Sequence, residues 1–197
     1  MKKTEIIFAI IALVGLLFSC LLWPGGGLLA TLGFFGLACL YMYFGFAFFN
    51  NIPLKKIFKG ESYTADTSEK RDYRIPISIF VGISFNTILI GLLFRFMFWP
   101  GGFFLMSVGI IFLVPMLIIS LIRFLKTKST FYTRIFIRMA VIGGIALFFL
   151  LMPNTTWLEI KFRNHPEYIE MMKECIKDPN NIELRKKMNE YRENHLF

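Results

Sequence analysis

The chain has 197 residues, of which 56% are hydrophobic and 24 are phenylalanine, and its formal net charge at pH 7 is +9. A soluble domain of this size cannot bury so much apolar surface, so the composition excludes an ordinary water-soluble protein. The charged residues separate apolar blocks of about 18 to 25 residues, the length with which an α-helix crosses roughly 30 Å of hydrocarbon. Five such blocks predict an all-α, polytopic membrane protein.

The first apolar block, residues 6–23, follows the basic start Met1-Lys2-Lys3. This start, followed by Leu17-Phe18-Ser19-Cys20, also resembles a bacterial lipoprotein signal in which Cys20 becomes the acylated residue. Phe18 is bulky where such signals carry a small residue, and the chain after Cys20 stays apolar. A first transmembrane helix is therefore the favoured interpretation, and lipid attachment at Cys20 is the alternative.

Two tight corners divide the next blocks into helical hairpins. Trp23-Pro24-Gly25-Gly26 precedes the second block, residues 28–49, and Trp99-Pro100-Gly101-Gly102 separates the third and fourth blocks, residues 75–99 and 103–124. Proline cannot continue a helix and glycine adopts positive φ without steric cost, so the chain turns at once. We therefore expect hairpin 1 at residues 1–50 and hairpin 2 at residues 75–125, with each tryptophan at the headgroup boundary.

The two hairpins predict an internal repeat. A shift of 76 residues aligns Gly15-Leu16-Leu17-Phe18 with Gly91-Leu92-Leu93-Phe94, aligns the two corners, and aligns Gly33 with Gly109. Shared hydrophobicity does not supply tryptophan, proline and glycine at matching spacings, so duplication is preferred to two unrelated helices that end in a similar breaker.

Lysine and arginine predict the orientation in the membrane. They gather at the N-terminus, in a loop at residues 51–74 and in the connection at residues 126–134, whereas the corners contain none. Positively charged segments face the cytoplasm, so we expect a bacterial inner-membrane protein whose corners face out. A fifth helix at residues 135–153 then places the tail, residues 154–197, outside. In the tail, Asn164 and Asn180 are predicted to begin two short helices.

Polar residues inside the blocks are the candidate functional residues. Arg95 lies within the third block, but only one helical turn before Trp99, so its side chain is expected to extend to the headgroups. Ser78, Gly82 and Asn86 share one face and predict a close helix contact with an interhelical hydrogen bond. Ala140 and Gly144 predict a similar contact in the fifth helix.

No motif for catalysis, cofactors or metals is found. The histidines, His165 and His195, lie thirty residues apart, and the cysteines, Cys20, Cys39 and Cys175, lack ligand spacing. Phosphate loops, nucleophile elbows and paired carboxylates inside the blocks are absent from the sequence. We expect no enzyme activity, no cofactor, no bound metal and no nucleic-acid partner.

The second corner carries a resemblance to a known family. Phe94, Arg95, Trp99, Pro100 and Gly101, set between two apolar helices, resemble the N-terminal hairpin of the gliding-motility protein L family, an inner-membrane component of the bacterial type IX secretion apparatus. The family's histidine before the tryptophan is Phe98 here, and its acidic residue in the second helix has no counterpart in residues 103–124. The resemblance therefore implies the hairpin shape and not the motor function.

Two classes of function follow. The first is a non-catalytic scaffold or subunit of a membrane complex, whose partners are the lipid bilayer and another membrane protein or a second copy. The second is a small transporter built from parallel repeats, which requires polar groups in the middle of the membrane. Few such groups are present, so the scaffold is preferred.

Overall fold

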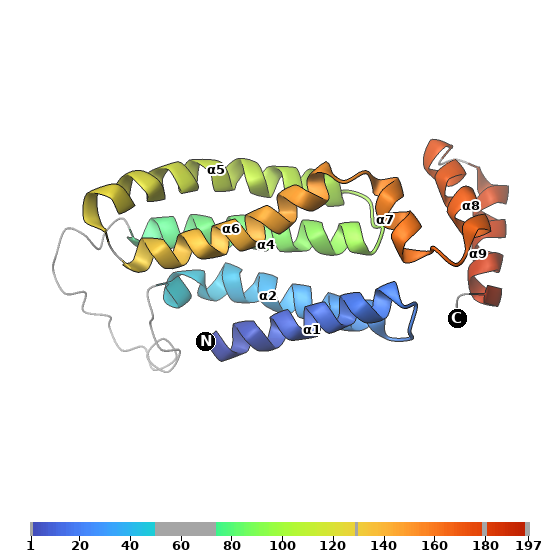
Figure 1. The fold of residues 1–197 in the computed structure, drawn as a ribbon, viewed down its shortest axis with the longest axis horizontal. Helices are drawn as coiled ribbons and strands as arrows, with labels where there is room; N and C mark the ends of the chain where they lie inside the picture. The colour runs from blue at the N-terminus through green and yellow to red at the C-terminus, as the bar shows by residue number, and fades with distance from the viewer. Residues whose placement is uncertain (1, 50–73, 129, 179–180, 196–197) are drawn as a thin grey trace.

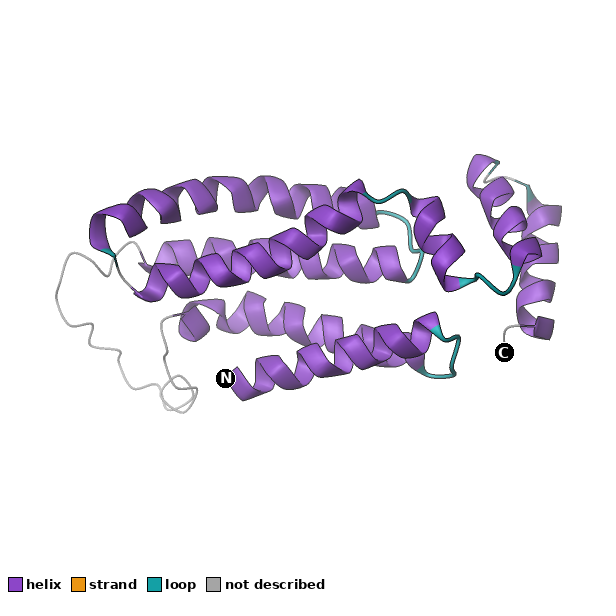
Figure 2. Cartoon of the chain, viewed as in Figure 1, coloured by secondary structure: helices purple, strands orange, loops and turns teal. Residues whose placement is uncertain are grey.

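The computed structural model describes residues 2–49, 74–128, 130–178 and 181–195, and these are helical without any strand (Figures 1 and 2). Five of the described helices are long and apolar enough to cross a membrane: α1 (Lys2–Cys20), α2 (Gly26–Phe49), α4 (Arg74–Phe96), α5 (Gly102–Thr127) and α6 (Thr130–Leu151). Three shorter ones follow: α7 (Asn154–Lys161), α8 (Pro166–Lys177) and α9 (Ile182–His195). The predicted all-α chain with five such helices is confirmed.

The five long helices lie side by side (Figure 1). Within the hairpins, α1 packs on α2 and α4 packs on α5. The two hairpins are joined by the packing of α2 on α4, and α6 packs on α5 and α4. Both corners and helices α7 to α9 lie at one end, here called the corner end, and the start of α1 lies at the other, here called the N-terminal end. The predicted loop at residues 51–74 falls outside the described residues except for Arg74.

The first corner begins with a Schellman motif, a helix ending in which one residue adopts the left-handed conformation. Leu22 is that residue, with φ 56°. The Trp23 N–H donates to the Phe18 carbonyl at 2.9 Å, and the Leu22 N–H donates to the Ser19 carbonyl at 3.4 Å. The Trp23 ring meets the Phe18 ring edge-on with centroids 5.0 Å apart, the apolar contact that accompanies this motif.

The second corner repeats this geometry. Phe98 has φ 56°, the Trp99 N–H donates to the Phe94 carbonyl at 2.8 Å, and those two rings lie 5.2 Å apart. Gly101 follows with φ 89° and ψ −6°, the values that the third residue of a type II turn takes after proline. A leucine and a phenylalanine thus occupy left-handed positions that helix endings usually give to glycine.

Replacing Gly101 with alanine should destabilise the protein by about 1–2 kcal/mol, because a Cβ disfavours positive φ. The added Cβ meets nothing within 4 Å, so backbone strain alone produces the effect. Gly27→Ala is the control, since its Cβ would lie in ordinary contact with Met97 at 3.6 Å. Unfolding in mixed detergent micelles measures both variants, and equal stability of the two would contradict the assignment of strain to Gly101.

Small residues bring the two helices of hairpin 1 into backbone contact. A Cβ built on Gly15 would lie 2.1 Å from the Ala30 nitrogen, and one on Gly33 would lie 2.3 Å from the Ala12 nitrogen. No side-chain rotation can relieve a collision with backbone atoms. Glycine at both positions is therefore a condition of this close approach.

Hairpin 2 makes the same contacts 76 residues later. A Cβ on Gly91 would lie 2.7 Å from the Met106 nitrogen, and one on Gly109 would lie 3.0 Å from the Ile88 nitrogen. At the shift of 76, the Gly91–Met106 contact corresponds to Gly15–Ala30, and the Gly109–Ile88 contact corresponds to Gly33–Ala12. The alignment found in sequence thus pairs positions with matching structural roles.

The predicted small-residue face of α4 packs on α2. Ser78 is fully buried, and a Cβ on Gly82 would lie 2.5 Å from the Tyr41 carbonyl oxygen. Asn86 is half-buried and, among the described residues, its side chain makes no interhelical hydrogen bond. The contact predicted in the fifth helix is wrong, because a Cβ on Gly144 would have nothing within 4 Å.

The tail contains one helix more than predicted. Pro153 precedes α7, which the sequence analysis did not separate from the tail. Helix α8 begins one residue later than expected, with His165 before Pro166. The Leu184 N–H donates to Asn181 Oδ1 at 3.0 Å, so Asn181 caps α9; the predicted start at Asn180 lies outside the described residues. Helices α8 and α9 pack on each other.

Candidate functional site

An ion pair joins α1 to α6 near the N-terminal end. Arg138 donates through Nε to Glu5 Oε1 at 3.0 Å and through Nη2 to Glu5 Oε2 at 3.1 Å. The two side chains are 19% and 18% exposed. This two-bond geometry is the strongest form of a carboxylate–guanidinium contact, and Glu5 also lies in the first turn of α1, where the helix dipole favours negative charge.

Tyr41 brings α2 into the same cluster. Its hydroxyl donates to Glu5 Oε1, and its ring, 3% exposed, meets the Phe85 ring of α4 edge-on. The Arg138 guanidinium lies 5.8 Å from the centre of the Phe49 ring, a cation–π contact. Glu5, Tyr41 and Arg138, here called the charged cluster, thus connect hairpin 1 to the fifth long helix.

A long apolar groove starts at the charged cluster. Its volume is about 700 Å³, and its walls come from α1, α2, α4, α6 and α7. At the N-terminal end it is lined by Glu5, Arg134 and Arg138, and toward the corner end by Phe149 and Trp157. Leu13 of α1 and Val141 of α6, which also line it, are 61% and 55% exposed. The groove is therefore open sideways, between α1 and α6.

The sequence contained a signal for this cluster that the interpretation did not use. Glu5 is the only acidic residue in the five long helices, and a lone carboxylate in an apolar helix predicts a basic partner. The predicted connection at residues 126–134 included Arg134. Helix α6 begins at Thr130, however, so both Arg134 and Arg138 lie within it.

Arg95 is buried in the protein and does not extend outward as predicted. Its side chain is 6% exposed, and Nη2 donates to the carbonyl oxygen of Met152, directly after the last residue of α6. A cation at that position satisfies an unpaired carbonyl and complements the helix dipole. Arg95 therefore ties α4 to the end of α6, while its Nε has no partner among the described residues.

A second hollow of about 620 Å³ lies at the corner end, between the corners and the tail. Its lining includes Trp23, Trp99, Lys161, Met172 and Arg192. The Lys161 ammonium lies 5.4 Å from the centre of the Phe98 ring. Burial lowers the pKa of Lys161 below its ordinary value of 10.5, and the nearby Cys20 thiol opposes this shift.

Replacing Lys161 with methionine should stabilise the protein at pH 7. Because folding lowers the pKa of this ammonium, its protonated form is disfavoured in the folded state, and the penalty disappears above the ordinary value of 10.5. The gain in unfolding free energy should therefore shrink as the pH rises from 7 to 10.5. Detergent unfolding of both proteins at the two pH values measures it, and a gain independent of pH would contradict the burial of charge.

The described residues hold no group of three or more histidine, cysteine, aspartate or glutamate side chains placed to bind a metal ion. The three cysteines of the chain, Cys20, Cys39 and Cys175, are all free. The structure places the two predicted polar residues, Arg95 and Asn86, on α4, apart from the charged cluster.

Comparisons with known proteins found no relative of this chain. No family model matches the chain, and neither a curated protein nor a solved structure matches it. The fold and the site define its class: an all-helical chain with five helices long and apolar enough to cross a membrane, and an ion pair between two of them.

Proposed function

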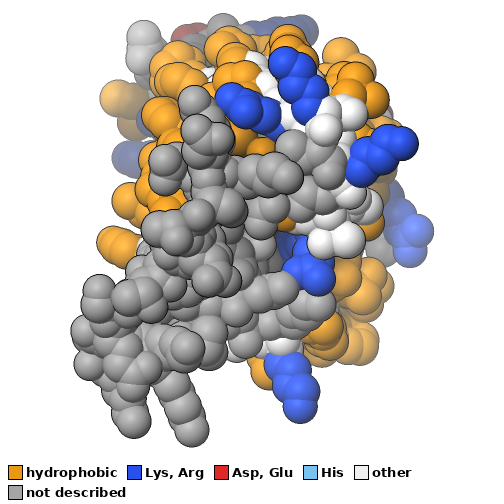
Figure 3. Space-filling model, turned by 90° about the vertical axis from the view of Figure 1, so that its left-hand side faces the viewer, with side chains coloured by type: hydrophobic (Ala, Val, Ile, Leu, Met, Phe, Trp, Pro, Cys, Tyr) orange, Lys and Arg blue, Asp and Glu red, His pale blue; other side chains and the backbone are white. Residues whose placement is uncertain are grey.

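We propose that the chain is a polytopic protein of the bacterial inner membrane that serves as a non-catalytic scaffold or subunit of a membrane complex. Its five long helices span the bilayer, with the N-terminal end in the cytoplasm and the corners and tail outside. The basic residues at the N-terminal end support this orientation (Figure 3). The bilayer and another membrane protein, or a second copy, are its partners.

The proposal rests on the partners of three charged side chains in the long helices, Glu5, Arg95 and Arg138. Glu5 and Arg138 bind each other across α1 and α6, and Arg95 binds the end of α6. The groove beside them is almost entirely apolar. Among the described residues these charges therefore serve to hold helices together, whereas a transporter needs polar groups along a route through the membrane.

We also propose that the two hairpins are copies of one unit. The matching corner dihedral angles and the equivalent glycine contacts support duplication. The two copies pack together through α2 and α4 into one bundle, an arrangement that suits a structural role.

Purification from the native membrane tests the function. The tagged chain, extracted in mild detergent, should elute with a stoichiometric membrane-protein partner or as a defined oligomer of itself. Reconstituted alone in liposomes, it should not accelerate solute or ion flux beyond empty liposomes. A solitary monomer that catalyses flux, with the flux abolished in a variant such as Asn86→Leu, would refute the scaffold and support the transporter.

The orientation is tested by cysteine labelling in whole cells. In a variant without native cysteines, Lys177→Cys on the exposed end of α8 should react with a membrane-impermeant maleimide. Lys128→Cys, exposed between α5 and α6, should react only after the inner membrane is permeabilised. The reverse pattern would overturn the proposed topology.

A further inference from the structure

We propose that the groove between α1 and α6 is a binding site for one anionic phospholipid, with an acyl chain along the groove and the phosphate at Arg134. The inference goes beyond the scaffold role, and it rests on the proposal that the five long helices span the bilayer.

The shape of the groove fits an acyl chain. From Arg134 to Phe149, both in its lining, the groove follows α6 for about 22 Å at 1.5 Å per residue. This exceeds the roughly 15 Å of hydrocarbon that one leaflet contributes. The volume of the groove is about 700 Å³, and beyond the charged cluster and Arg134 its lining is apolar. The groove therefore has the length and the apolar lining that an acyl chain needs.

The opening of the groove gives a lipid access from the side. Ile137, Val141 and Ile145 follow one another along α6 at the helical spacing of four, and all three line the groove while remaining about half exposed or more. They face Leu13 of α1 across it, also exposed. A chain that enters from the bilayer covers these side chains without crossing a polar barrier.

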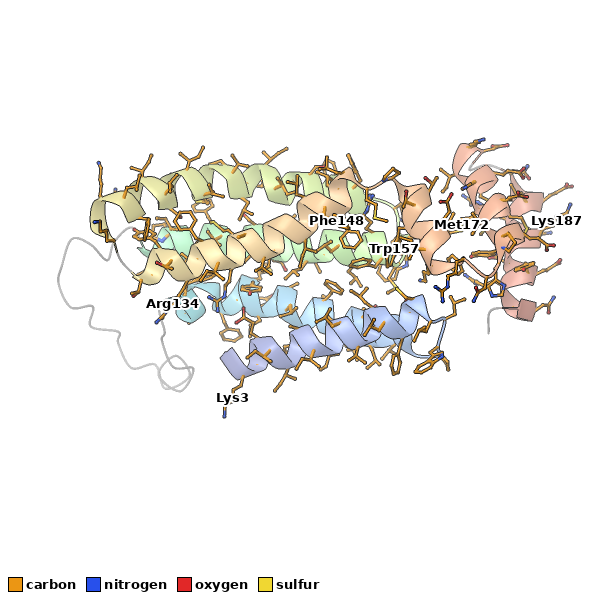
Figure 4. All side chains as sticks on the ribbon, viewed as in Figure 1. Lys3, Arg134, Phe148, Trp157, Met172 and Lys187 are labelled. Carbon is orange, nitrogen blue, oxygen red and sulfur yellow. The ribbon has the colours of Figure 1, made fainter. Side chains whose placement is uncertain are left out.

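The positive charge of Arg134, at the N-terminal end of the groove, predicts that the lipid headgroup is anionic. Glu5 already neutralises Arg138 through two hydrogen bonds, so the pair offers no net charge. Arg134 lies one turn earlier on the same face of α6 and lines the groove, at the N-terminal end of the bundle (Figure 4). No described carboxylate forms an ion pair with it. The Arg134 guanidinium therefore adds one net positive charge beside a neutral ion pair and should attract an anion. Its planar set of N–H donors matches the geometry of phosphate oxygens.

Native mass spectrometry of the delipidated full-length protein tests the proposal with two probes, phosphatidylglycerol and phosphatidylcholine of identical acyl chains. We expect one phosphatidylglycerol to bind about tenfold more tightly than phosphatidylcholine. Both headgroups carry a phosphate, but phosphatidylcholine neutralises its own with a trimethylammonium group, so only phosphatidylglycerol brings net negative charge to the Arg134 guanidinium. Arg134→Gln should remove this preference. The matched control Lys126→Gln, which removes an exposed charge of α5 outside the groove, should retain it.

A second variant tests the groove itself. Ile145→Trp places a bulky ring in the groove wall, far from the headgroup, and should weaken binding of both lipids by a similar factor. Equal losses for Arg134→Gln and Lys126→Gln would show general surface attraction and overturn the headgroup site. Undiminished binding in Ile145→Trp would overturn the groove. Because these two variants change different parts of the site, failure of one to fold leaves the other decisive.

Discussion

Replacing Arg138 with methionine is expected to destabilise the bundle by about 3 kcal/mol, because Glu5 then keeps a charge between helices without its cation. The pair joins α1 to α6, which otherwise pack on different partners. Tyr41 continues to donate to Glu5 but cannot neutralise it. Reversible unfolding in mixed detergent micelles, followed by circular dichroism, measures the change.

Two further variants identify the cause of this loss. Arg134→Met removes the same charge one turn away, where no described carboxylate pairs with the guanidinium, and should change stability by less than about 0.5 kcal/mol. The double variant Glu5→Gln, Arg138→Met leaves no uncompensated charge and should recover at least half of the loss. A double variant as unstable as Arg138→Met alone would show that packing, and not charge, is responsible.

Replacing Gly15 with alanine is expected to destabilise hairpin 1 by about 3 kcal/mol, at the upper end for inserting one methyl group into a packed contact. The new Cβ would lie 2.1 Å from the Ala30 nitrogen, so α1 and α2 must move apart as whole helices. That movement also loosens the Gly33 contact with Ala12. The same unfolding measurement applies.

Gly144→Ala is the matched control, because it adds the same methyl group to a long helix where nothing lies within 4 Å. It should be neutral or slightly stabilising, since alanine favours a helix over glycine. Gly91→Ala should resemble Gly15→Ala but cost less, because one of its nearest contacts is the flexible Met106 side chain. Equal effects of Gly15→Ala and Gly144→Ala would disprove the close approach of α1 and α2.

The five long helices were predictable because each depends on a local property, an unbroken apolar run of sufficient length. The corners were predictable for a similar reason, since proline and glycine restrict or free the backbone at their own positions. The left-handed conformation at Leu22 and Phe98 was not. It arises because the following tryptophan packs back on Phe18 or Phe94, a contact that becomes visible only once the helix end is formed.

The sequence by itself determined the five long apolar helices, the two corners and the alignment of the hairpins. Tertiary structure alone decided which polar residues meet. Arg95 turned inward because the end of α6 lies beside it. Gly144 faced open space because none of the described helices covers that side of α6. Glu5 and Arg138, 133 positions apart, form a pair because the packing order of the helices places α6 near α1. Hydrophobic length fixes each helix separately, but it does not specify that order.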